Sequence, residues 1–182
     1  MYCSNNNSPL TQSDVICSFR GYVVRHVLWM RVYIADIISE TQNADYTGEQ
    51  AAENARDFTE MIRKYYGYEH AREVESLLLD GIAATRDTLR NIKAGDVVMK
   101  DEHRGFNVKL TNKFAAMNPN WKRDELYRYL DVYYKTLEDE MRHHMENHGG
   151  DGDTRYREAG HEALEMADFM AEGFIRQFGI IY

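Results

Sequence analysis

The sequence predicts an all-α protein, a mainly antiparallel bundle of five to six helices. Three observations lead to this fold class. Apolar residues recur at spacings of three and four over long stretches, as they do on the buried face of a helix. The 182 residues include only two prolines, so long helices can run without interruption. Glycines follow directly after two of the periodic stretches, where helices commonly end.

The first helix is expected over residues 13–40. Ser13 is its predicted N-cap, because a serine oxygen can accept a hydrogen bond from a free backbone N–H. Within this helix His26 takes an inward position that a hydrophobic residue should hold, and Arg31 lies at the border of the inward face. Burial of either residue requires a partner. The inward positions are Ile16, Phe19, Val23, His26, Met30, Tyr33 and Ile37.

Two further helices are expected over residues 49–66 and 69–94, with Gly67 ending the first of them. The link between them is so short that they should be antiparallel neighbours. The helix over residues 69–94 places Gly81 on its inward face, where glycine lowers helix stability by roughly 1 kcal/mol relative to alanine. Either a neighbouring helix comes close to Gly81, or the space beside it is left for a ligand to bind. We expect a small pocket there, beside His26.

The second half of the chain predicts a polar connection over residues 96–106 and helices over residues 107–117, 122–147 and 154–178. Asn118-Pro119-Asn120-Trp121 should form a turn, because a residue before proline leaves the helical conformation. Trp121 is expected to pack back onto the bundle and to hold the short helix before it in place.

Composition narrows the classes of partner. The formal charge is −8, with 22 basic against 30 acidic residues and no basic cluster, which argues against nucleic acid. No apolar run is long enough to span a membrane. Two cysteines without a disulfide framework favour a reducing compartment. We expect a soluble, cytoplasmic protein, with a flexible polar leader over residues 1–12 and a single helical-bundle domain over residues 13–182.

Several short motifs stand along the chain in this order: His26-Val27-x-Trp29-x-Arg31, Asn54-x-x-Asp57, Tyr65-Tyr66-Gly67, Asn118-Pro119-x-Trp121, Met166-Ala167-Asp168, and Gly173 with Gln177-Phe178. The series resembles a family of small, uncharacterised helical-bundle proteins of spore-forming bacteria. The resemblance covers most of the chain, from about Tyr22 onward, and implies a helical bundle without an assured activity. Each motif alone is weak, whereas their joint order is fairly specific.

The chain also departs from that family. Members carry a Leu-Leu-x-Glu-His-Leu motif in the third helix, and here Gly81 stands in place of its histidine. They carry another histidine after the Asn-Pro turn, at a place that falls near Val132 here. The family pattern of three histidines and an aspartate implies a divalent metal site. Of these four residues this chain keeps His26 and Asp168, which are its candidate metal ligands.

Seven residues are candidates for a ligand site. His26 is either a ligand or base inside the bundle, or a core histidine that is hydrogen-bonded to a neighbour. Asp168 lies beside the inward face of the last helix and needs a cation, for which Arg31 is the expected partner, with Asp57 competing for it. A structural ion pair is the simpler interpretation. The seven candidates are His26, Trp29, Arg31, Asn54, Asp57, Gly81 and Asp168.

Two Glu-x-x-His pairs, Glu140 with His143 and Glu158 with His161, are similar to the ligand pairs of di-iron bundles. The first and third helices offer no inward glutamate opposite them, so we do not expect a di-iron site.

Two functions therefore stay open. The first is a non-catalytic binding or structural protein that works through its surface or as a homo-oligomer. The second is a metal- or small-ligand-binding bundle, with or without catalysis, built around His26, Arg31, Asp57 and Asp168. The first is slightly favoured, because the missing family histidines remove the strongest chemical argument for the second.

Overall fold

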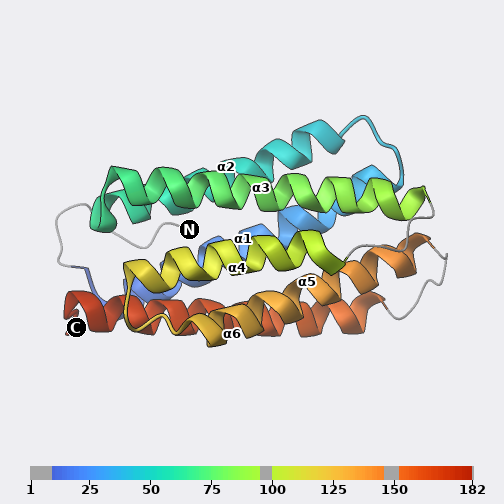
Figure 1. Ribbon diagram of the computed structural model, residues 1–182. Helices are drawn as coiled ribbons and strands as arrows, with labels where there is room; N and C mark the ends of the chain where they lie inside the picture. The colour runs from blue at the N-terminus through green and yellow to red at the C-terminus, as the bar shows by residue number, and fades with distance from the viewer. Residues whose placement is uncertain (1–9, 95–99, 146–151, 182) are drawn as a thin grey trace.

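The computed structural model describes residues 10–94, 100–145 and 152–181, and these ranges contain helices and no strand (Figure 1). The predicted all-α fold is confirmed. No helix in the described ranges is long and apolar enough to cross a membrane. The helices are α1 (Gln12–Ile38), α2 (Ala44–Tyr66), α3 (Tyr68–Lys93), α4 (Lys100–Met117), α5 (Arg123–Met145) and α6 (Gly152–Phe178).

The six helices form a closed ring in chain order. Each helix packs on the next one along the chain, and α1 packs on α6 to complete the ring. Consecutive helices run in opposite directions, so α1, α3 and α5 are parallel to one another (Figure 1). These three helices also contact each other across the ring. The interior is therefore reached by side chains from every helix.

The first helix begins at Gln12, and its N-cap is Thr11, two residues before the expected N-cap Ser13. The Thr11 hydroxyl accepts a hydrogen bond from the Asp14 N–H at 3.1 Å, and the Asp14 carboxylate accepts one from the Thr11 N–H at 3.0 Å. This reciprocal pair satisfies two backbone donors that the helix leaves free. Residues 1–9 of the predicted leader lie outside the described part of the chain.

Gly67 alone separates α2 from α3. Its backbone φ of 89° lies in a region that glycine adopts without a steric penalty, which explains why a single residue can reverse the chain here. The predicted helix end is confirmed. The start of α2 lies at Ala44, five residues before the expected one, so the loop after α1 is shorter than predicted.

The largest correction concerns α4, which begins at Lys100, whereas the sequence predicted a polar connection up to Phe106. Lysine, glutamate and arginine are good helix formers, so a polar segment on the outside of a bundle can be helical without an apolar face. Phe106 is buried and packs against Gly81 of α3.

Trp121 is buried, with only 1% of its surface exposed, as its predicted packing requires. Its indole N–H donates a hydrogen bond to the Met170 carbonyl at 2.9 Å. The ring lies against Gly173, where an added Cβ would come within 2.4 Å of the Trp121 Cδ1 atom. The turn between α4 and α5 is thus fixed to α6 through close contact with a residue that has no side chain.

Candidate functional site

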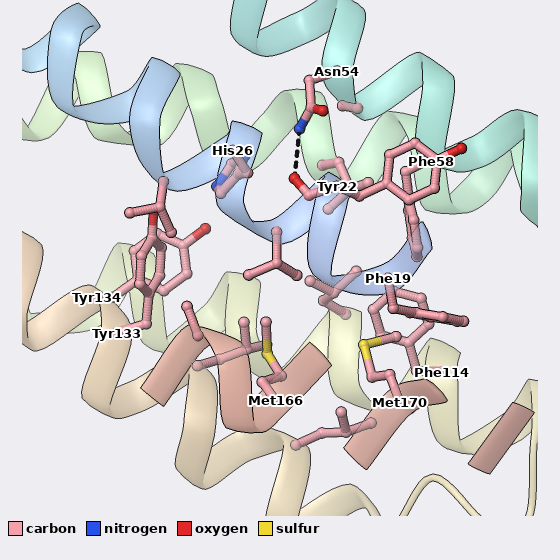
Figure 2. A pocket seen from close by; sticks show the side chains of 18 residues that line it. Phe19, Tyr22, His26, Asn54, Phe58, Phe114, Tyr133, Tyr134, Met166 and Met170 are labelled. Atoms are coloured by element: carbon pink, nitrogen blue, oxygen red, sulfur yellow. Dashed lines mark hydrogen bonds between the residues drawn. The ribbon is translucent and has the colours of Figure 1, made fainter. Parts of the chain in front are cut away.

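A partly open cavity of about 100 Å³ lies among the helices of the ring, and its walls come from all six of them (Figure 2). Most of the lining side chains are aromatic or aliphatic. The cavity is lined by Phe19, Tyr22, Val23, His26 and Val27 of α1, Asn54, Ala55 and Phe58 of α2, Leu78 of α3, Leu110 and Phe114 of α4, Leu126, Leu130, Tyr133 and Tyr134 of α5, and Ala163, Met166 and Met170 of α6.

The two ends of the cavity differ in chemistry. At one end the rings of Phe19 and Phe114 both meet Phe58 edge to face, with centroids 6.0 and 6.3 Å away from it. At the other end the imidazole of His26 lies 6.0 Å from the ring of Tyr133. Figure 2 shows His26, Tyr133 and Tyr134 grouped at this end. The cavity therefore has an aromatic end and a polar end.

His26 is held in its neutral form. Burial among apolar side chains lowers the pKa of its imidazole from 6.5 to about 4, because the charged form loses its hydration there. The His26 side chain forms no hydrogen bond to any described residue. A neutral imidazole carries one N–H donor and one nitrogen acceptor. At neutral pH both remain available to a molecule in the cavity.

Burial also raises the pKa of Tyr134, so this phenol stays protonated at neutral pH. Its hydroxyl lies close to α3, where a Cβ added to Gly81 would approach it within 3.2 Å. Tyr133 and Tyr134 were not among the predicted site residues. Tyr133 occupies an inward helical position, and this periodicity was the available signal for it.

Gly81 does not line the cavity. An added Cβ would lie 2.7 Å from the Cζ atom of Phe106, so the ring of Phe106 already fills the space that the missing side chain leaves. The predicted cavity beside His26 exists, but the prediction that Gly81 opens it was wrong. Trp29 also stays outside the cavity, with its ring 6.5 Å from that of Tyr46.

Asn54 lines the cavity and also joins α1 to α2. Its side-chain amide donates a hydrogen bond to the Tyr22 carbonyl at 3.0 Å (Figure 2). Its oxygen accepts one from Arg25 at 2.9 Å. Arg25 also lies 3.7 Å from the carboxylate of Asp57. Arg25, which the sequence analysis did not single out, thus ties together the Asn54-x-x-Asp57 motif. Asp57 takes part in this exposed bridge and does not reach the cavity.

Asp168 pairs with Arg20 and not with Arg31. Both carboxylate oxygens of Asp168 accept hydrogen bonds from the Arg20 guanidinium, each at 2.6 Å. Arg31 lies about three turns further along α1, roughly 16 Å from Arg20 along the helix axis. The expected contact between Arg31 and Asp168, direct or through Asp57, is therefore wrong. The Arg20–Asp168 pair is a partly exposed bridge between α1 and α6.

The candidate metal ligands do not converge. His26 faces the interior cavity, whereas both oxygens of Asp168 are engaged by Arg20. Among the described residues no group of three or more histidine, cysteine, aspartate or glutamate side chains is placed to hold a metal ion. Of the Glu-x-x-His residues, Glu158 and His161 are exposed. The side chains of Glu140 and His143 lie outside the described set. The described residues do not fit the metal site of the family.

Comparisons of the chain with protein-family models, with curated proteins and with solved structures found no match. The resemblance to the bundle proteins of spore-forming bacteria stays a prediction from the motifs.

Proposed function

We propose that this protein reversibly binds a small, uncharged, mainly apolar molecule in the cavity inside its helical ring. The observation that carries the proposal is the cavity of about 100 Å³, walled by all six helices and lined mostly by apolar side chains. Apolar cavities in proteins take up small apolar molecules.

The energetics favour an occupant. A cavity of this size lowers stability by at most about 2 kcal/mol, because the surrounding side chains lose packing contacts. A ligand that restores these contacts stabilises the folded state in proportion to its concentration and affinity. Met166 and Met170 line the cavity, and their flexible side chains can adapt to ligands of somewhat different shape.

Toluene is a suitable probe for this proposal, because it is apolar, uncharged and small. We expect toluene to raise the melting temperature of the protein in calorimetry and to shift the methyl NMR signals of Met166 and Met170. The signal of Met30, which is buried but does not line the cavity, serves as an internal reference.

Ala163→Leu supplies the variant for the same experiment, because Ala163 lines the cavity and a larger side chain would occupy it. The toluene shift should disappear in this variant. It should persist in Gly21→Ala, a change on the exposed face of α1 where an added Cβ meets nothing within 4 Å. Absence of any toluene effect on the parent protein would overturn the proposal.

A second candidate function, self-association, is favoured by the outward face of α1. Val24, Leu28 and Val32 lie in one row and are 41%, 52% and 43% exposed. A valine lies four residues before Leu28 and another four residues after it, so the row can pack on itself across a two-fold axis between identical chains. We expect a concentration-dependent dimer in sedimentation equilibrium that Leu28→Glu abolishes. A monomer at all concentrations would exclude this second candidate.

A further inference from the structure

The polar end of the cavity constrains what the ligand can be. His26 offers one donor and one acceptor, and no described residue hydrogen-bonds to its side chain. A ligand that hydrogen-bonds to His26 supplies the partner that the imidazole needs, whereas an apolar ligand that displaces water from the ring does not, so the first gains over the second. A hydroxyl can both donate to the imidazole nitrogen and accept from its N–H.

The remaining surface of the cavity constrains the rest of the ligand. Phe19, Phe58 and Phe114 present ring edges and faces at the end away from His26 (Figure 2). Aromatic rings pack favourably edge to face against one another. On α1, Phe19 and His26 are about two turns apart, which corresponds to roughly 10 Å along the helix. A volume of about 100 Å³ leaves room for one ring and not two.

Charge is excluded by the same surroundings. Burial already opposes the protonation of His26, and it would oppose a carboxylate or an ammonium group on the ligand in the same way. The ligand must therefore be neutral at the pH at which it binds.

From these constraints we infer that the ligand belongs to the class of small neutral phenols: a single planar ring that packs against Phe19, Phe58 and Phe114, with one hydroxyl hydrogen-bonded to the imidazole of His26. This inference rests on the proposed function. It adds the prediction that the protein distinguishes phenol from toluene, which have nearly the same size and shape.

The experiment measures the affinities of phenol and toluene by calorimetric titration at pH 7. The parent protein should bind phenol about fivefold more tightly, the increment of one neutral hydrogen bond. In His26→Leu the preference for phenol should disappear or reverse, because the phenol hydroxyl loses the imidazole as its partner. His161→Leu is the matched control, since His161 is exposed on α6 and should leave the ratio unchanged. Benzoate should not bind.

The outcomes separate the two claims. If neither probe binds, the proposed function fails. If toluene binds at least as tightly as phenol, or if His26→Leu leaves the ratio unchanged, the phenol inference fails while the proposed function stands. Tight binding of benzoate would likewise overturn the neutral class. If His26→Leu does not fold, ¹⁵N NMR of the parent decides: phenol must shift the His26 ring nitrogens, and toluene must not.

Discussion

His26 should make the stability of the protein depend on pH in a defined window. Its pKa is about 4 in the folded state and 6.5 when exposed, so between these values the unfolded chain binds a proton that the folded chain does not. His26 therefore leaves the free energy of unfolding unchanged above pH 6.5 and lowers it progressively as the pH falls from 6.5 towards 4. The loss has an upper limit of about 3 kcal/mol, because His26 keeps some accessible surface.

Urea denaturation at pH 7 and at pH 4.5 measures this effect, with His26→Leu as the comparison. The difference between the two pH values should be smaller in the variant by the contribution of His26. An equal loss in parent and variant would show that His26 is hydrated and charged in the folded state.

Two glycines should respond in opposite ways to alanine. Gly81→Ala places a methyl group against the ring of Phe106, and we expect it to destabilise the fold by about 1–2 kcal/mol despite the gain in helix propensity. Gly21→Ala meets open space and should stabilise by about 0.5–1 kcal/mol. Chemical denaturation of both variants measures the contrast. Stabilisation by both would mean that Phe106 moves aside freely.

At the scale of elements, the turn before α5 depends on Trp121. Trp121→Ala removes a buried ring together with its hydrogen bond to Met170, and the expected loss is about 3–5 kcal/mol in chemical denaturation. Gly173→Ala should act in the same direction, because its methyl group would displace the ring. A loss below about 1 kcal/mol for Trp121→Ala would contradict the role of the ring as a clamp.

Apolar periodicity was sufficient to predict most helices, because α1, α2, α3, α5 and α6 each have an apolar face along much of their length. The first two turns of α4 lack one. Residues 100–105 are polar or glycine, and local composition alone does not distinguish a solvated helix from a connection. The helix continues there, and Phe106 behind it is anchored against Gly81.

A site residue that stands out on its own helix could be predicted from the sequence, whereas the ion pairs between helices could not. His26 stood out because a histidine interrupts an apolar face. The partner of Asp168 depends on how far α6 is shifted along α1, and the sequence does not determine this shift. Arg20, Arg25 and Arg31 all had suitable chemistry, and the packing of the bundle selects Arg20.

For the whole molecule, the ring order means that most packing joins helices that follow one another in the chain. The largest exception is the contact between α1 and α6, which joins opposite ends of the described sequence. A bundle dominated by contacts between consecutive helices has a low contact order, which favours rapid folding. The Arg20–Asp168 bridge and the packing of Phe19 on Phe174 belong to the contact that completes the ring.

Because the ring is closed, the chain can begin and end at a different loop of the ring without losing a contact between helices. The side chain of Gln12 donates a hydrogen bond to the Ile180 carbonyl at 2.9 Å, so the two ends of the described bundle are neighbours. A circular permutant can join residue 181 to residue 10 through about six glycine and serine residues, which span roughly 13 Å on average. New ends would open in the turn between α1 and α2.

The permutant should keep the helix content and the buried Trp121 fluorescence of the parent. Its stability should change by no more than about 2 kcal/mol, since one short loop replaces another. Circular dichroism and denaturation measure both properties. A collapsed chain without cooperative unfolding would show that α1 must be made first. If the permutant folds, the packing of the six helices in a ring determines the fold, and the position of the chain ends does not.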